Sequence, residues 1–326
     1  MPFVNKSKFY NPATAPAVIS KDQRKVVFLT GGNSGIGWFT ALHLYQHGYV
    51  VYLAGRTESK VLKAIDDIKA EAVKRGTSTP GELSYIHLDL TDLSTVDKAV
   101  EEFSQKEKSL DILINNAGLM GVPFEVTKDD YEIQYQVNFV GHFLLTLKLI
   151  PFLENAAKGG VTPRIVNLAS VGHNFEVTHI SPANNKLKKF PDSVFTWVRY
   201  GLAKTAQIQF AKELAIKYPN ILSLSVHPGV VIGTELYNYW KSLPVIGFAA
   251  RGLFAAADKT IGVTVEEGSL ASLRAALDPT LTLNENGDYL TTGGSVDKPS
   301  GIASNPEYAK ETWDWNVEQL KKRGFL

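Results

Sequence analysis

The sequence predicts an α/β fold in which a doubly wound parallel sheet is covered by helices on both faces. Short apolar runs rich in β-forming residues alternate with stretches of helical period along most of the chain. This alternation indicates βαβ units, which make the strands parallel and bury both faces of the sheet. Because no Pro/Gly/Ser-rich linker divides the 326 residues, we expect a single domain with insertions.

The expected elements follow one another in regular order. We expect strands at residues 25–30, 49–54, 83–88, 112–115, 164–168 and 222–227. We expect helices at residues 36–46, 58–74, 93–106, 128–155 and 195–217, and a further helix at 305–325. These elements divide the chain into an N-terminal extension (1–22), the main domain (23–300) and a C-terminal helical segment packed on it (301–326).

Two stretches interrupt this order. Residues 173–192 are polar and basic, so we expect a surface insertion that could shape the entrance for a substrate. Residues 234–260 are aromatic and apolar, which suits the wall of a small-molecule site. Core packing or a dimer face would explain the same aromatic residues equally well, and the oligomeric state stays open.

Composition excludes several classes of protein. The net charge is +1, so the basic footprint that drives nucleic-acid binding is absent. Residues 1–20 lack the apolar run of a secretory signal, and residues 139–153 contain His142 and Lys148, which indicates a buried core helix. We therefore expect a cytoplasmic protein without a transmembrane segment. The chain has no cysteine, and His142, His173 and His179 lack metal-ligand spacing with a nearby carboxylate, so we expect no metal.

A glycine-rich turn joins the first strand to the first helix. Residues 30–37 read TGGNSGIG, and glycines there let the backbone approach a pyrophosphate at the free N–H groups of a helix N-terminus. In isolation the string is a weak signal, but the strand before it and the βα units after it favour dinucleotide binding. The residues expected to contact the cofactor in this turn are Gly31, Ser34, Gly35, Ile36 and Gly37.

The end of the second strand indicates which dinucleotide binds. Arg56 and Lys60 stand where NAD enzymes usually place a carboxylate for the ribose 2′-hydroxyl. A guanidinium suits a 2′-phosphate, so we expect NADP(H) rather than NAD(H), although Glu58 could neutralise Arg56. Asp89, after the third strand, could contact the adenine or could serve only to cap the next helix.

Tyr200 and Lys204 are the candidate acid–base pair. Four residues apart on the helix at 195–217, they lie on one face, and a cation there would bring the pKa of a phenol closer to neutral pH. Tyr237 and Lys241 repeat the spacing, but they fall in the aromatic block and not between the fifth and sixth strands. Asn115 and Ser170 end neighbouring strands at the edge where open α/β sheets bind ligands.

These motifs occur together in an order that resembles the short-chain dehydrogenase/reductase family, over about residues 25–297. The motifs are TGGNSGIG (30–37), NNAG (115–118), Asn138, Ser170, Tyr200 with Lys204, and Pro228-Gly229. Residues 138–146, 164–170 and 227–231 are most similar to the retinol-dehydrogenase-like branch, especially its fungal relatives. The resemblance implies a Rossmann fold, but it does not imply the membrane anchor of retinol dehydrogenases, because this N-terminus lacks an apolar anchor.

The resemblance also implies a role for each matching position. Tyr200 would donate or remove the proton at the substrate oxygen, Lys204 would lower its pKa and hold the nicotinamide ribose, and Ser170 would hydrogen-bond the substrate oxygen. Asn138 would anchor a water that links Lys204 to solvent. Val231 and Thr234 would contact the cofactor, although the interval from Pro228 to Thr234 is one residue longer than the branch pattern.

Three functions follow as alternatives. The first is an NADP(H)-dependent oxidoreductase that reduces an aldehyde or ketone, or oxidises the corresponding alcohol. The second keeps the chemistry but acts as an alcohol dehydrogenase on a steroid- or retinoid-like lipid. The third is a non-catalytic NADP(H)-binding sensor, which predicts decay of the set Asn138, Ser170, Tyr200 and Lys204; all four are present.

Overall fold

The computed structural model describes residues 5–18, 23–231 and 262–326. Within these residues, eight strands form one sheet in the order β3-β2-β1-β4-β5-β6-β7-β8. The strands are β1 (Val26–Thr30), β2 (Val50–Gly55), β3 (Glu82–His87), β4 (Ile112–Asn115), β5 (Arg164–Leu168), β6 (Leu222–Val226), β7 (Tyr289–Leu290) and β8 (Val296–Asp297). The predicted doubly wound sheet is therefore confirmed.

The strand order reverses between β1 and β4. Both neighbours of β1 run parallel to it, with Val27 opposite Val51 of β2 on one side and Ile112 of β4 on the other. The connection after β1 leads to β2 on one side, and the connection after β4 leads to β5 on the other side. The loops that follow β1 and β4 therefore diverge, which opens a crevice at the carboxyl ends of the strands. Only the pairing of β7 with β8 is antiparallel among the strand pairs of the described sheet.

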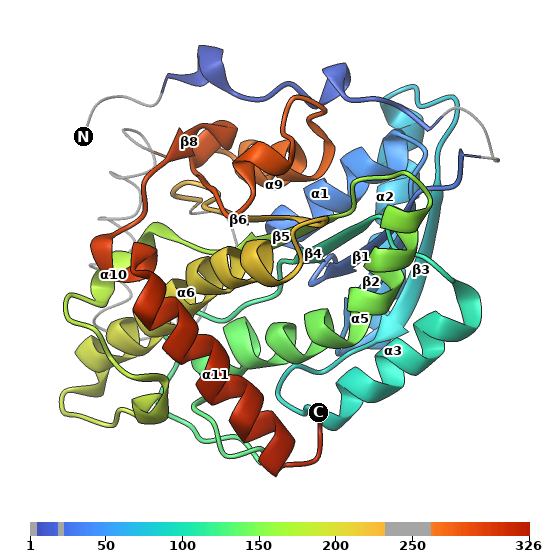
Figure 1. The fold of residues 1–326 in the computed structure, drawn as a ribbon. Helices are drawn as coiled ribbons and strands as arrows, with labels where there is room; N and C mark the ends of the chain where they lie inside the picture. Colours follow the sequence, from blue (N-terminus) through green and yellow to red (C-terminus); the bar gives the residue numbers. More distant parts are fainter. Residues whose placement is uncertain (1–4, 19–22, 232–261) are drawn as a thin grey trace.

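Helices cover the sheet on both sides (Figure 1). Helices α1 (Gly35–Gln46), α2 (Glu58–Lys74) and α9 (Val265–Leu277) pack on one face. Helices α3 (Ser94–Lys106), α5 (Gly141–Lys158) and α6 (Asp192–Lys217) pack on the other. Alternate residues along β1 divide between the two cores, with Phe28 facing α3 and Leu29 facing α1, because successive side chains of a strand point to opposite faces.

One long apolar stretch crosses the second face. It comprises α4 (Ile133–Tyr135), the π-helical turn η4 (Gln136–Val140) and α5. By length and hydropathy the stretch from Ile133 to Lys158 could span a membrane, but 78% of its most apolar window is buried inside the fold. The prediction of a buried core helix is confirmed. The π-helical turn was not predicted, because a single wide turn does not alter the apolar period enough to be recognised.

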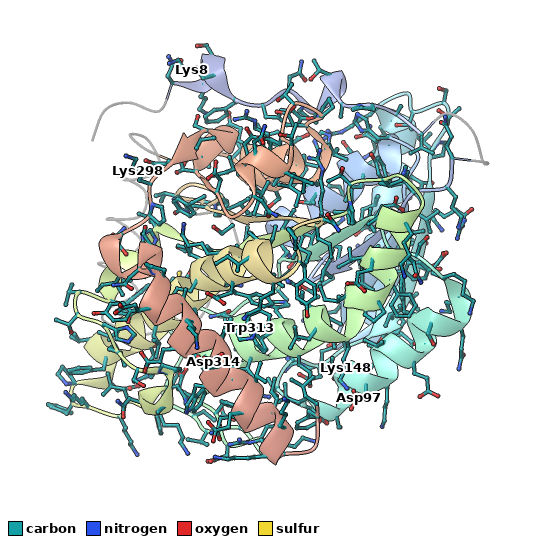
Figure 2. All side chains as sticks on the ribbon, in the orientation of Figure 1. Lys8, Asp97, Lys148, Lys298, Trp313 and Asp314 are labelled. Carbon is teal, nitrogen blue, oxygen red and sulfur yellow. The ribbon has the colours of Figure 1, made fainter. Side chains whose placement is uncertain are left out.

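The C-terminal segment packs against α6. It contains α11 (Pro306–Lys322), which lies within the predicted helix at 305–325, and the short helix α10 (Gly301–Ser304) before it. Trp313 of α11 lies 5.1 Å, centroid to centroid, from Phe143 of α5 (Figure 2). Figure 2 also shows Lys148 of α5 beside Asp97 of α3, an ion pair with an N–O distance of 2.6 Å. Aromatic packing and this ion pair hold three helices together on one face of the sheet.

The N-terminal extension is part of the fold wherever the structure describes it. The backbone N–H of Tyr10 donates to Gly293 O at 2.8 Å, and the ring of Phe9 occupies the space where a side chain at Gly293 would lie. Lys6 forms an ion pair of 2.8 Å with Glu267 of α9. Two short 3₁₀ turns, η1 (Lys6–Lys8) and η2 (Pro12–Thr14), shape this segment as it crosses α9. The extension therefore covers the α9 side of the molecule.

The expected surface insertion lies largely on the surface, but parts of it are buried. It carries the 3₁₀ turns η5 (Val171–Phe175) and η6 (Pro182–Asn184). Glu176 and Asn185 are each 2% exposed, and Asn185 Oδ1 accepts the backbone N–H of Glu132 at 3.0 Å. The buried side chains of Glu176 and Asn185 form hydrogen bonds with backbone N–H groups, so the polarity of this segment does not mean that every residue in it contacts water.

Candidate active site

The turn after β1 has the geometry of a phosphate cradle. Gly31 and Gly35 have φ angles of +68° and +58°, which residues with a Cβ rarely adopt. A Cβ on Gly37 would lie 2.3 Å from Gly31 O, so the backbone closes only around glycine. Ser34, at the N-cap of α1, makes no side-chain capping bond, so the first N–H groups of α1 remain available to an anion.

A cavity of about 490 Å³ opens at this turn and runs across the carboxyl ends of the strands. Its wall contains nearly all the predicted cofactor and catalytic positions that the structure describes. These are Gly31, Ser34, Gly35, Ile36, Gly37, Arg56, Lys60, Asp89, Ser170, Tyr200, Lys204 and Val231. Residues separated by more than 170 positions thus meet at one site, at the crevice that the strand order creates. Thr234, Tyr237, Lys241 and the rest of the block 234–260 lie outside the described residues.

Arg56 and Lys60 form the positively charged end of the cavity. Both side chains are exposed, and neither forms an ion pair with a carboxylate in the part of the chain that the structure describes. Glu58 therefore does not neutralise Arg56 there. Asp89 lines the same end and also accepts from the N–H and hydroxyl of Thr91, at 3.0 and 2.7 Å. Its carboxylate both shapes the turn after β3 and faces the cavity.

Asn115, a predicted cofactor contact, does not lie on the wall of the cavity. Its side chain is fully buried and donates to Thr146 Oγ1 and Asn167 Oδ1, both at 2.9 Å. The next residue, Asn116, lines the cavity together with Ala117 and Gly118. Because consecutive residues at a strand end face opposite ways, an error of one position moves a side chain from the cavity to the core.

Three catalytic candidates share the far end of the cavity. Lys204 Nζ donates to Leu168 O at 2.6 Å and to Gln207 Oε1 at 2.9 Å, and it lies 5.6 Å from the centroid of the Tyr200 ring. Burial lowers the pKa of Lys204 to about 7. Ser170 Oγ accepts the backbone N–H of Gly172 at 3.0 Å, which leaves its hydroxyl hydrogen to be donated elsewhere. The arrangement places a phenol, a hydroxyl and an amino group on the wall of one cavity.

Asn138 lies beside this group but behind the cavity wall. Its amide bonds both backbone groups of Leu119, accepting from N at 2.7 Å and donating to O at 2.9 Å. A Cβ on Gly118 would lie 2.7 Å from Asn138 Oδ1 and 3.8 Å from Lys204 Nζ, so the three residues are neighbours. In this structure Asn138 fixes the loop that lines the cavity, and it satisfies its own polarity within the π-helical turn.

Two histidines were recognised in the sequence but given no role at the site. His142 Nδ1 donates to Asn138 O at 3.0 Å, so its neutral Nε2 accepts the Thr30 hydroxyl at 2.8 Å. His173 Nδ1 donates to Ser170 O at 2.6 Å, and its Nε2 accepts the Ser300 N–H at 3.0 Å. Burial lowers the pKa of His142 to about 4 and lowers that of His173 below its usual range. Each neutral imidazole ring therefore links two groups by hydrogen bonds, and both rings hold the backbone around the cavity in place.

Gly172 is a further site residue that the sequence did not reveal. A Cβ there would lie 2.5 Å from a ring carbon of Tyr200 and 3.2 Å from Ser170 Oγ. Its hydrogen therefore allows the Tyr200 ring to stand directly against the Ser170 turn. The φ angle of Gly172 is not in the left-handed region, so no turn pattern marked this glycine as important.

Comparisons with known proteins show which proteins this chain is similar to. The family model described as short chain dehydrogenase matches residues 25–182. A short-chain dehydrogenase/reductase of Aspergillus calidoustus, drtF, is 32% identical over 93% of this chain and 95% of its own length. A human polyprenol dehydrogenase is 28% identical over 90% of this chain and 84% of its own. The solved complex of Pseudomonas aeruginosa RhlG with NADP has the same fold, with a TM-score of 0.62, 20% identity, and coverage of 87% of this chain and 98% of that one.

Proposed function

The chain belongs to the short-chain dehydrogenase family, and we propose that it is an NADP(H)-dependent oxidoreductase acting on a carbonyl group or the corresponding alcohol. One observation carries the proposal: Ser170, Tyr200 and Lys204 line the same cavity as the glycine turn and Arg56. A dinucleotide that extends from Arg56 past the turn would bring its reactive end to these three side chains.

The residues at the glycine turn fit a dinucleotide diphosphate. The open N-terminus of α1 supplies N–H donors, and the glycines leave space that a Cβ would fill. Arg56 and Lys60 supply two cations where the adenosine ribose would lie, which supports a 2′-phosphate and hence NADP(H) over NAD(H). The RhlG structure, a complex with NADP, supports the same choice.

The side chains at the far end handle the proton and the substrate oxygen. The bound nicotinamide supplies or accepts hydride, and carbonyl reduction requires one proton in addition. We assign that proton to the Tyr200 hydroxyl, and we assign a hydrogen bond to the same substrate oxygen to Ser170. The neighbouring ammonium of Lys204 favours loss of the phenolic proton. Alcohol oxidation would use the same groups in the opposite direction.

A lipid alcohol is a second candidate substrate. The human relative is named a polyprenol dehydrogenase, and apolar side chains of Met120, Val122 and Val137 line this cavity. The sensor alternative is less well supported, since Ser170, Tyr200 and Lys204 stand together on the cavity wall and Asn138 lies directly behind it.

The test follows the absorbance of the reduced cofactor: consumption of NADPH or NADH with aliphatic, aromatic and quinone carbonyls, and its formation from NADP+ or NAD+ with steroid, retinoid and prenol alcohols. We expect turnover that prefers NADPH and falls by about 100-fold or more in Tyr200→Phe, since acid–base assistance contributes that much. Tyr218→Phe, at the C-terminal end of the same helix, is the matched control. NADPH binding without turnover on any substrate would favour the sensor.

A further inference from the structure

Exposed apolar side chains are concentrated in the segment between Ser170 and Tyr200. The described residues expose large apolar side chains at twelve positions, and five of these lie between residues 171 and 194. Phe190 is 95% exposed and Val177 is 83% exposed. Single exposed apolar residues are common on a protein surface, but a local concentration marks a surface that meets a partner.

Positive charge accompanies this apolar surface. Lys186, Lys188 and Lys189 line a shallow cavity of about 470 Å³ and directly precede Phe190. The ammonium groups of Lys188 and Lys189 lie over aromatic rings, and neither pairs with a carboxylate among the described residues. We call Lys186, Lys188, Lys189 and Phe190 the Lys–Phe patch. The chain carries a net charge of only +1, so this charge is a local feature.

The acidic residues of the same segment do not neutralise the patch. Glu176 has a fully buried side chain, and Asp192 is paired with Arg199 at 2.7 Å. Lys186 is paired with Asp130 at 2.8 Å, so Lys188 and Lys189 supply the uncompensated charge. Lys188, Lys189 and Phe190 are all exposed, so the patch combines two cations without a carboxylate partner among the described residues and one exposed aromatic ring.

Buried contacts hold the backbone of the patch in place. The fully buried guanidinium of Arg199 donates to Leu187 O at 3.2 Å and also bonds Glu132 at 3.2 Å. Arg199 directly precedes Tyr200 on α6. Phe190 is therefore exposed on an anchored segment, and its exposure is not that of a loose chain end.

We propose that the Lys–Phe patch docks on the surface of a membrane that contains anionic phospholipids. An aromatic side chain next to lysines fits such an interface, since the ring enters the boundary of the acyl chains and the ammonium groups meet lipid phosphates. A second copy of the chain fits less well, because a two-fold axis would bring the same cations face to face. An acidic protein would be held by the lysines but gives no reason for the solvated Phe190 ring.

Docking here would place the lipid beside the apolar wall of the active-site cavity. Lys188 lies 5.3 Å from the ring centroid of Phe124, and the loop that leads to Phe124 lines the cavity at Val122. The hydroxyl of Thr196 on α6 donates to Val122 O at 2.6 Å, which joins the loop to the patch segment. Delivery of an apolar substrate from the bilayer rests on the proposed function, whereas the docking itself needs neither cofactor nor turnover.

The chain has no cysteine, so a single substitution gives a unique labelling site for the test. Phe190→Cys, labelled with a polarity-sensitive fluorophore, should shift to shorter wavelength with vesicles of phosphatidylcholine and phosphatidylserine. It should not shift with phosphatidylcholine alone. Val73→Cys on α2, where the native side chain is 77% exposed, is the matched control and should not respond to either vesicle.

Unlabelled variants test the charges by co-sedimentation with the same vesicles. Lys188→Gln/Lys189→Gln should lower partitioning into anionic vesicles by about tenfold or more. Phe190→Ser should lower this partitioning as well. The control Lys69→Gln/Lys98→Gln, with one substitution on α2 and one on α3, should leave it unchanged. Absence of a shift at position 190, or equal sedimentation of the wild-type and patch variants, would overturn the proposal whether or not the chain reduces a carbonyl.

Discussion

The two ends of the active-site cavity differ in how they are built. The cofactor end consists of a glycine turn and two exposed cations, Arg56 and Lys60, close together in sequence. The catalytic end consists of buried groups, Tyr200 and Lys204, held by backbone from distant segments. The first end can be altered by surface substitutions without loss of packing, whereas a change at the second end disturbs partners in several elements.

One buried chain of hydrogen bonds connects the two ends. The Thr30 hydroxyl, at the end of β1, accepts the N–H groups of Asn116 and Ala117 and donates to His142, which in turn donates to Asn138 O. Asn138 holds the loop at Leu119 on the catalytic side. His142 is therefore the residue whose loss should affect both ends together.

The largest expected effect is on stability in acid. The folded-state pKa of His142 is lowered to about 4 from 6.5, so its stabilising contribution is present above pH 6.5 and is lost as the pH falls to 4. The loss for this residue alone is about 3 kcal/mol at 1.36 kcal/mol per pKa unit. Denaturant unfolding at several pH values should show that His142→Gln flattens this acid slope. An unchanged slope would mean that His142 is not buried as a neutral ring.

A side chain in the glycine turn should affect the cofactor end alone. Gly37→Ala places a Cβ within 2.3 Å of Gly31 O, so the turn must open, and we expect NADPH to bind at least about 100-fold more weakly. Titration of protein fluorescence with NADPH measures this change. Gly301→Ala, where no atom lies within 4 Å of the new Cβ, is the control and should bind as the wild type does.

Loss of the His173 bridge should affect the catalytic end alone. His173→Phe leaves Ser170 O and the Ser300 N–H without their partner, so Ser170 shifts and kcat should fall by about tenfold. The dissociation constant of NADPH should not change, because His173 does not line the cavity. A weakening of NADPH binding as large as the loss of kcat would show that the two ends are not separable.

Local sequence predicted the cofactor end well. The strand, turn and helix around residues 25–46 follow from apolar period and glycine spacing, and α2, β4 and β5 have the predicted bounds. Arg56 and Lys60 also line the cavity as the sequence predicted, since Arg56 directly follows β2 and Lys60 lies in the first turn of α2.

The catalytic end could be predicted only in part. Tyr200 and Lys204 were found from their spacing, but His173 meets Ser300 across 127 positions, which no local pattern can show. Helix α9 and the two-residue strands β7 and β8 were not predicted. The strands are too short to have a period, and they form only because β7 pairs with β6 and β8 pairs with β7. Asn116, and not the predicted Asn115, lines the cavity, because two adjacent amides cannot be told apart without knowing which one faces the core.

The separation of the two ends can be tested directly by comparing Arg56→Ala with Tyr200→Phe for NADPH binding and for turnover. Arg56→Ala should raise the dissociation constant of NADPH by about tenfold, change that of NADH little and leave the maximal rate near the wild-type value. Tyr200→Phe should bind NADPH as the wild type does and lose turnover by about 100-fold or more. Equal binding by wild type and Arg56→Ala, or full turnover by Tyr200→Phe, would contradict the division of roles proposed for this cavity.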